Sequence, residues 1–293
     1  MKFGFAINPY SGNLTIDNKY NVIKKASKLL DGESIIAGLD TKSKIEFRDC
    51  IKDLENKVDV IIGCGGDGTI YDIINSIKEQ TTISYLPLGT GNALKYTLPL
   101  PNSITKNLKQ IKNGKVHLVD LILCNNDKKA LLASIGVDGQ ILKLRKKYLI
   151  PKGGSNIKGF IPYIRATIDA IFKEYERCNI KIDVDGNIIE IENALSLIIT
   201  KIPFYGFGLN IMPEAVLDDG NLHLRYINSG TLNVCYGILT SFLNKNKIGK
   251  YIKAKKISIL SDKKLILQIH GDIEKEDNNF DFEILPNKLR MIY

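Results

Sequence analysis

The sequence predicts an α/β N-terminal domain with a parallel sheet over residues 1–121 and a β-rich antiparallel C-terminal domain over residues 122–293. Two observations predict this division. Up to about residue 120, short apolar runs alternate with helical patterns, which is typical of parallel strands connected by helices. Beyond that point strand-like runs follow one another, many of them bounded by Asp-Gly or Asn-Gly turns, as in antiparallel sheets. We expect the last strand to stay in the second domain or to return to the first.

The predicted elements of the first domain follow a βαβα order. Its strand-like runs are KFGFAI, SIIAG, VDVIIG and ISYLPLG. Helical periodicity predicts helices near residues 17–30, 42–56, 69–78 and 104–112. Because parallel strands bring their carboxyl ends to one edge of the sheet, we expect ligands to bind at that edge.

The second domain is predicted to consist mainly of short strands. The runs are HLVDLILC, ALLASIGV, IKIDVDGNIIEI, ALSLIIT, LHLRYI, KKISIL, LILQIHG and FDFEIL. Two helical stretches, near residues 159–176 and 232–243, interrupt this series.

The composition is that of an ordinary globular protein, with 44% hydrophobic and 25% charged residues among 293. The longest apolar runs fall short of the roughly 18 to 20 residues that span a bilayer. The first residues lack the longer apolar region and cleavage site of a secretory signal. Five cysteines lie far apart without a CxxC pair, which predicts neither disulfides nor a zinc site. We therefore expect a cytoplasmic protein.

The formal net charge of +9 includes two basic clusters. The first comprises Lys143, Arg145, Lys146, Lys147 and Lys152, and the second comprises Lys245, Lys247, Lys250, Lys253, Lys255 and Lys256. Each basic residue near an anionic membrane surface contributes about 1 kcal/mol, so peripheral membrane association is one interpretation and a solvated surface is the other. No nucleic-acid-binding signature accompanies the charge, and we expect no nucleic-acid partner. A homodimer is also compatible with the sequence.

Three glycine-rich turns fall where strands of the first domain are predicted to end. They are NPYSG (Asn8 to Gly12), GGDGT (Gly65 to Thr69) and LPLGTGN (Leu86 to Asn92). Glycine lets the backbone approach an anion closely, and the amides at a following helix N-terminus donate to phosphate oxygens. Asp67 lies within the second turn, where a carboxylate beside phosphates requires magnesium to offset repulsion. The pattern therefore predicts a site for ATP with Mg²⁺.

The glycines Gly63, Gly65 and Gly68 also fit the GxGxxG pattern of dinucleotide-binding proteins. That pattern requires an acidic residue roughly 20 positions later, to bind a ribose. No acidic residue occurs between Glu79 and Asp120, which argues against a dehydrogenase. Glycines that only form tight turns remain an alternative.

These motifs resemble the diacylglycerol kinase catalytic-domain superfamily, over nearly the whole chain. Three motifs of this chain resemble family motifs. NPYSG resembles the family motif NPxSG, and GGDGTIYDIINSI resembles the family motif GGDGTxxEVxxGL. LPLGTGNAL resembles the family motif LPxGTGN(D/A). Further along, SIGVDGQI, GFIPYIRATIDAI and MPEAVLDDGNLHLRYI are similar to later family motifs, in the same order.

The resemblance implies a first domain like that of NAD kinases and phosphofructokinases, and an ATP-dependent lipid kinase activity. The γ-phosphate would be transferred to a hydroxyl of diacylglycerol or a related lipid, such as a sphingoid base, at an anionic membrane surface. Because NAD kinases and phosphofructokinases share the GGDGT or GGDGS loop, an NAD-type kinase with a soluble acceptor is the alternative.

The resemblance also implies individual site residues. A structural magnesium would be held by the Asp219 carboxylate with backbone carbonyls near Val216 and Asn221. Nucleotide contacts are implied for Asn8, Pro9, Tyr10, Ser11, Gly12, Thr41, Gly65, Gly66, Asp67, Gly68, Thr69, Ile70, Tyr71 and Thr90.

The sequence departs from the family at the motif implied to accept the proton of the lipid hydroxyl. The family has DGE there, and this chain has His270, Gly271 and Asp272. We predict that Asp272 serves as the base, that Asp67 holds the magnesium, and that His270 assists, because the ordinary pKa of histidine suits proton transfer. A structural histidine with satisfied hydrogen bonds at the end of a strand is the alternative for His270. A catalytically impaired ATP-binding homologue is the competing interpretation.

Overall fold

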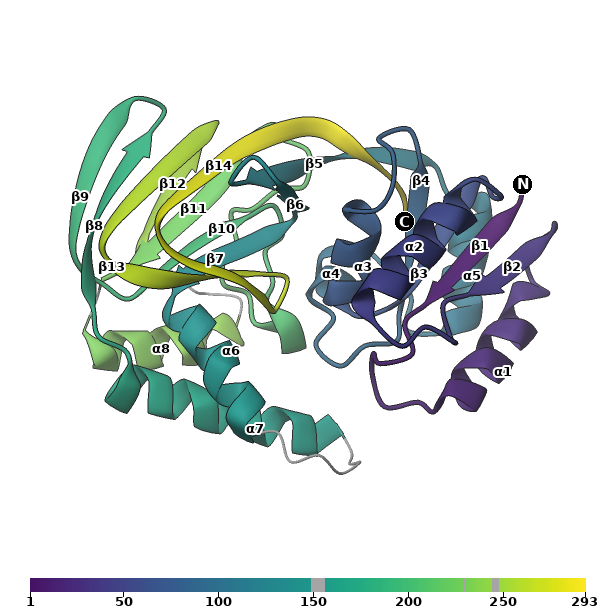
Figure 1. Ribbon diagram of the computed structural model, residues 1–293, viewed down its shortest axis with the longest axis horizontal. Helices are drawn as coiled ribbons and strands as arrows, with labels where there is room; N and C mark the ends of the chain where they lie inside the picture. Colours follow the sequence, from purple (N-terminus) through teal and green to yellow (C-terminus); the bar gives the residue numbers. More distant parts are fainter. Residues whose placement is uncertain (149–155, 229, 244–247) are drawn as a thin grey trace. The chain divides into compact units, whose positions relative to one another are not determined.

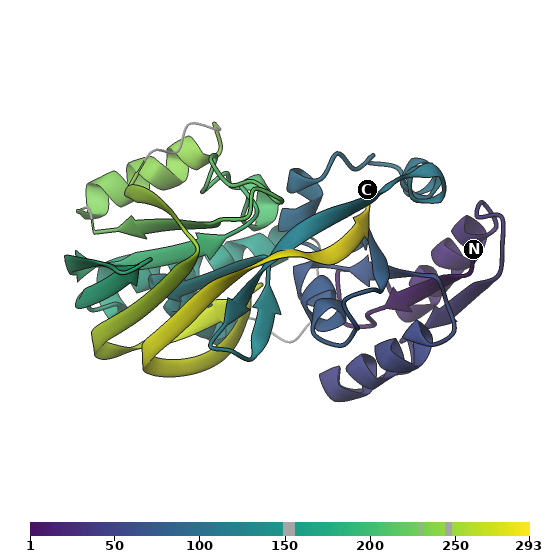
Figure 2. The ribbon, with the colours of Figure 1, turned by 90° about the horizontal axis from the view of Figure 1, so that it is seen from above.

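The computed structural model describes residues 1–148, 156–228, 230–243 and 248–293 (Figure 1). The chain forms two compact units. The first comprises Met1–Val119 and Asn287–Tyr293, and the second comprises Asp120–Pro286. Two strands that pair with each other, β5 (Val116–Cys124) and β14 (Asp272–Ile292), carry the chain from one unit to the other (Figure 2).

The first unit is built on a parallel sheet with the order β4-β3-β1-β2. The end of β14 adds a further parallel strand beside β4, where Arg290 pairs with Thr82. The strands are β1 (Phe3–Ile7), β2 (Ser34–Ala37), β3 (Val60–Gly65) and β4 (Thr82–Pro87). The helices are α1 (Ile16–Ser27), α2 (Lys44–Glu55), α3 (Asp67–Ile74), α4 (Ala93–Thr97) and α5 (Ile104–Asn113).

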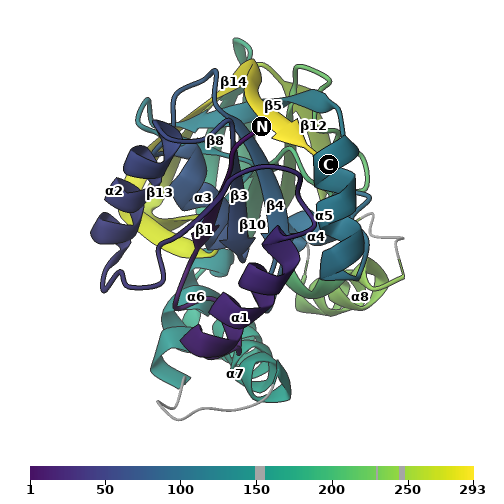
Figure 3. The same ribbon diagram turned by 90° about the vertical axis from the view of Figure 1, so that its right-hand side faces the viewer.

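Helices cover both faces of this sheet (Figure 3). Helices α1 and α5 share one apolar core with alternate residues of β1, such as Phe5 and Ile7, while α2 and α3 pack on the other face. The starts of α1 and α2 are capped by Thr15 and Ser43, whose side-chain oxygens accept backbone N–H groups of the first turn. The predicted α/β fold is confirmed for this part of the chain.

The second unit is an antiparallel β structure. Its strands run in the order β12-β11-β10-β7-β13-β14, with β8 and β9 added through β13. Besides β5 and β14, the strands are β6 (Lys128–Ala130), β7 (Leu132–Gly136), β8 (Cys178–Val184), β9 (Asn187–Ala194), β10 (Ser196–Thr200), β11 (Leu222–Ile227), β12 (Lys250–Ala254) and β13 (Lys256–Ile269). The predicted antiparallel, β-rich class is confirmed.

Three α-helices accompany these strands in the described residues. They are α6 (Val137–Tyr148), α7 (Asn156–Asp169), which continues as the π-helical turn η1 (Ala170–Glu174), and α8 (Thr231–Ser241). The sequence analysis assigned the run ALLASIGV to a single strand and missed α6. The strand ends at Gly136, whose φ of +103° leaves the extended region, and the helix starts at Val137.

No helix within the described ranges has both the length and the hydropathy to cross a bilayer.

Candidate active site

The three glycine turns of the first unit contact one another at the carboxyl edge of the parallel sheet. A Cβ atom on Gly89 would lie 2.4 Å from the Cα atom of Gly66, and one on Gly12 would lie 1.9 Å from the carbonyl oxygen of Leu88. The N–H groups of Leu88 and Gly89 both donate to the carbonyl oxygen of Gly65 at 2.9 Å. These turns therefore meet as bare backbone, which only glycine allows.

This edge includes the topological switch point of the sheet. From β1 the chain continues to β2 on one side, whereas β3 and β4 lie on the other side. Ligands of open α/β sheets bind where the strand order reverses in this way. The first two glycine turns follow β1 and β3, the strands on either side of that point.

The NPYSG turn is held in shape by its own polar groups. Asn8 Nδ2 donates to Thr69 Oγ1 at 3.1 Å, and Asn8 Oδ1 accepts the N–H of Tyr10 at 2.9 Å. The Ser11 hydroxyl donates to the carbonyl oxygen of Asn8, while the Tyr10 side chain is 70% exposed. The turn after β1 is thus tied to the turn after β3.

Lys19 is a residue of this site that the sequence analysis missed. It lies on α1, is 1% exposed, and donates from Nζ to the carbonyl oxygens of Asn8 at 3.0 Å and Pro9 at 2.7 Å. Burial lowers the pKa of this ammonium group. A buried lysine that braces a glycine turn places positive charge beneath a predicted phosphate site. The only local signal was a lysine in the helix that follows the motif.

Asp67 joins the second and third turns. Its carboxylate accepts the N–H groups of Ala93 at 2.9 Å and Leu94 at 3.1 Å, at the start of α4. Burial raises the pKa of Asp67, against the effect of these backbone hydrogen bonds. Carboxylate oxygens accept more than one hydrogen bond each, so acceptor capacity remains for a cation.

The other implied nucleotide residues differ in accessibility. The side chains of Ile70 and Tyr71 are fully buried, so only their backbone can face a ligand. Thr41 follows β2, and its hydroxyl donates to the carbonyl oxygen of Gly38 at 2.7 Å. Thr90 is partly exposed in the third turn.

The HGD motif forms the tight turn between β13 and β14. His270 and Gly271 have φ values of 48° and 85°, as the two central residues of a type I′ hairpin do. His270 Nε2 accepts the N–H of Leu131 at 2.8 Å, and burial lowers the pKa of the ring to about 4. Because Nε2 is engaged by the backbone, His270 helps to hold this turn in shape, and its predicted part in proton transfer stays a prediction. Asp272 is partly exposed beside it.

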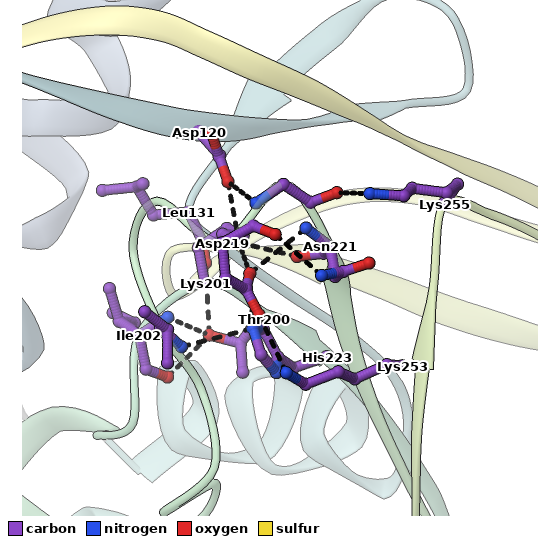
Figure 4. Close-up of polar contacts among 12 residues, drawn as sticks. Asp120, Leu131, Thr200, Lys201, Ile202, Asp219, Asn221, His223, Lys253 and Lys255 are labelled. Carbon is purple, nitrogen blue, oxygen red and sulfur yellow. Dashed lines mark hydrogen bonds and ion pairs between the residues drawn. The ribbon is translucent and has the colours of Figure 1, made fainter.

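In the acidic turn implied to bind magnesium, a lysine side chain contacts Asp219 and Asn221 (Figure 4). Lys201 Nζ lies 2.7 Å from Asp219 Oδ1 and 2.6 Å from the carbonyl oxygen of Asn221, so an ammonium group already engages two of the three implied ligands. The N–H of Val216 donates to His223 Nε2, a bond that does not involve the carbonyl oxygen implied as the third ligand. Across the described ranges, no group of three or more His, Cys, Asp or Glu residues is arranged to hold a metal.

A cavity of about 490 Å³ lies within the second unit, bordered by α6, α7, α8 and β10. Its walls are mainly aliphatic, with Asp138 as the acidic group. The Ser196 hydroxyl donates to Asp138, and burial raises the pKa of that carboxyl to about 6. The sequence analysis quoted SIGVDGQI but did not single out Asp138. An acidic residue within an apolar run was the available signal.

Large apolar side chains are exposed on two of the helices that border this cavity. On α7 and η1 they are Ile161, Ile164, Ile168 and Phe172, and on α8 and just beyond it they are Tyr236, Leu239, Phe242 and Leu243. Of the predicted basic clusters, Lys152, Lys245 and Lys247 lie outside the described residues, while Lys143, Arg145, Lys146 and Lys147 lie on α6. Lys253 faces Asp219, so the second cluster is not purely a solvated surface.

The fold and these turns define a class of protein, in which a parallel α/β domain with a glycine-turn edge is joined to an antiparallel β domain. Residues 2–124 match the diacylglycerol kinase catalytic domain, and residues 133–293 match the YegS C-terminal NAD kinase beta sandwich-like domain. The chain therefore belongs to the diacylglycerol kinase family of lipid kinases.

Individual relatives agree with this family. A diacylglycerol kinase of Staphylococcus epidermidis is 30% identical over 227 residues, which cover 75% of this chain and 69% of the relative. A solved structure of a diacylglycerol kinase from Bacillus anthracis has the same fold, with a TM-score of 0.77 and 23% identity over 100% of this chain and 96% of that chain. An NAD kinase from Archaeoglobus fulgidus, solved in complex with ATP, has a TM-score of 0.53 and 16% identity over 100% of this chain and 94% of its own.

Proposed function

We propose that the protein is an ATP-dependent lipid kinase that phosphorylates a hydroxyl group of a lipid whose acyl chain enters the cavity of the second unit. The observation that carries this proposal is the cavity itself. Its aliphatic walls suit a hydrocarbon chain, and the buried Asp138 suits a polar group at the end of that chain. A dinucleotide acceptor would require a polar pocket instead.

The contacting glycine turns support ATP as the phosphate donor. Gly12, Gly66 and Gly89 let the three turns approach one another closely at the edge where a phosphate chain would lie, and Lys19 contributes positive charge there. Asp67 is the carboxylate of this edge that fits a magnesium ion bound together with the nucleotide. Such an ion supplies charge that offsets the negative charge of the phosphates.

The acceptor side requires a group that takes the proton of the lipid hydroxyl. In the proposed reaction the hydroxyl oxygen forms a bond to the γ-phosphorus, the bond between that phosphorus and the β,γ-bridging oxygen breaks, and ADP leaves. Asp272 receives the hydroxyl proton, and Asp138 accepts a hydrogen bond from the lipid head. His270 keeps the hairpin that carries Asp272 in shape.

We further propose that α7 and α8 contact the membrane from which the lipid is taken. The apolar side chains of Ile164, Ile168 and Leu239 are 43%, 49% and 64% exposed. Helices that expose apolar side chains in this way can bury them in a bilayer interface. Arg165 and Lys173, on the same helical segment, suit an anionic lipid surface.

The test offers the purified protein labelled ATP and magnesium with diacylglycerol, a sphingoid base or NAD as acceptor. We expect label in a chloroform-soluble lipid. Label in NADP, or no transfer while ATP still binds, would contradict the proposal. The Asp272→Asn variant is expected to lose transfer and to keep ATP binding, because only the proton acceptor is removed.

The cavity is tested by Thr167→Phe, which places a ring among its walls. The KM for a long-chain lipid should rise by roughly tenfold or more, because the chain loses its apolar contacts, while the KM for ATP stays unchanged. Ile45→Phe, on α2 and 72% exposed, is the matched control. An unchanged KM for the long-chain lipid would exclude this cavity as the acyl site.

A further inference from the structure

Lys201 is a fully buried lysine whose ammonium group is completely hydrogen-bonded. It directly follows β10, where its backbone N–H donates to the carbonyl oxygen of Leu131 at 2.7 Å. Its Nζ lies 2.7 Å from Asp219 Oδ1, 2.6 Å from the carbonyl oxygen of Asn221 and 3.1 Å from Asp120 Oδ2 (Figure 4). An ammonium group has three N–H donors, so these three oxygens satisfy it.

The two carboxylates around Lys201 are themselves sequestered. The side chain of Asp120 is 1% exposed and that of Asp219 is 19% exposed. Asp120 Oδ2 also accepts the N–H of Gly220 at 2.7 Å, which fixes the acidic turn to β5. Two carboxylates held this close together in a buried site require a cation between them.

Lysine side chains offset the two negative charges of this cluster without a metal ion. Asp120 and Asp219 carry two negative charges. Lys201 and Lys253 supply two positive charges, the latter from a half-exposed position with Nζ 3.1 Å from Asp219 Oδ2. Lys255 adds a third by donating to a carbonyl oxygen of the turn. A divalent ion would bring a large excess of positive charge into this partly buried cluster.

A neighbouring histidine also contacts this cluster. His223 Nε2 lies 3.2 Å from both the backbone nitrogen of Val216 and Asp219 Oδ1, and its Nδ1 contacts the hydroxyl of Tyr251 at 2.8 Å.

We propose that the Lys201 ammonium is the resident cation of the Asp120 and Asp219 cluster and replaces the divalent metal that the family resemblance implies at this turn. Its contacts have hydrogen-bond lengths of 2.6 to 3.1 Å, whereas Mg²⁺ and Ca²⁺ lie about 2.0–2.1 and 2.3–2.6 Å from their oxygen ligands. A metal would compete for the same oxygens of Asp219 and Asn221. The second unit is therefore stable without divalent ions.

The test uses thermal unfolding of the full chain without nucleotide or lipid, so its result does not depend on the kinase activity. The Tm of the unmodified protein should be the same in EDTA, Mg²⁺ and Ca²⁺. Lys201→Met keeps the apolar stem and removes the ammonium group. In EDTA its Tm should fall by roughly 10 °C, because two buried carboxylates lose their counter-charge. Mg²⁺ or Ca²⁺ should restore part of that loss, because the metal then enters the vacated position.

Lys253→Met is the matched control, since it removes the half-exposed lysine from the same Asp219 carboxylate. It should lower the Tm by only a few degrees and show no response to metal.

Three results would overturn the proposal. The first is evidence of a metal in the unmodified protein. Such evidence would be a Tm that falls in EDTA, or one divalent ion per chain that stays bound during dialysis against a chelator. The second is an unchanged Tm for Lys201→Met in EDTA. The third is a destabilised Lys201→Met protein that gains nothing from either metal. If that variant does not fold, the metal content and EDTA response of the unmodified protein still decide.

Discussion

A single methyl group at Gly89 tests whether contact between the glycine turns shapes the nucleotide site. In Gly89→Ala the new Cβ atom would lie 2.4 Å from Gly66 Cα and 2.6 Å from Asn92 Oδ1, against an ordinary contact of 3.4 to 4 Å. The second and third turns must therefore move apart by about 1 Å. Misplacement of this size costs on the order of 100-fold in rate, and overpacking costs roughly 1–3 kcal/mol of stability.

The assay is calorimetric titration with ATP and magnesium, followed by the transfer rate, at a temperature well below the Tm. We expect the Kd for ATP to rise by at least about tenfold. The reason is that a small displacement of the turns removes several hydrogen bonds between their backbone and the nucleotide at once. Gly230→Ala is the matched control, since Gly230 has a φ of −60° and no atom within 4 Å of its Cβ position. The reasoning is refuted if Gly89→Ala binds ATP and transfers phosphate as well as Gly230→Ala does.

Two further changes probe buried polar groups. The pKa of His270, lowered from 6.5 to about 4, predicts that stability falls by roughly 3 kcal/mol as the pH drops through that window, because the unfolded histidine takes up a proton that the folded one does not. Urea unfolding across this pH range should show the loss, and His270→Asn should flatten it. An equally steep profile in the variant would contradict the assignment. Lys19→Met leaves two carbonyl oxygens of the first turn without their donor, which should cost about 1–3 kcal/mol and weaken ATP binding, as thermal unfolding and titration would show. Lys24→Met, exposed on the same helix, is the control, and equal behaviour of the two variants would rule out the bracing role.

Much of the fold could be predicted from the sequence because local patterns encode it. Alternation of apolar runs with helical periodicity predicted the parallel sheet, and Asp-Gly turns such as Asp185–Gly186 predicted antiparallel hairpins. The missed helix α6 shows the limit of this approach. Its apolar residues Val137, Ile141 and Leu144 have helical spacing, but they continue directly from a strand, and only the positive φ of Gly136 separates the two.

The sequence by itself determined the glycine turns and their place at the ends of parallel strands. Whether a position requires glycine depends on the local backbone conformation and on the neighbouring turns, which the order of the strands brings together. Only the tertiary structure decided how charged groups are used. Lys201 ends an apolar run and resembles a solvated lysine, yet it meets Asp120 and Asp219 from distant parts of the chain. His270 has an ordinary pKa in the unfolded chain, and burial against Leu131 makes it a neutral acceptor. The charge state of a side chain depends on burial and on partners far away in sequence, and neither follows from local spacing.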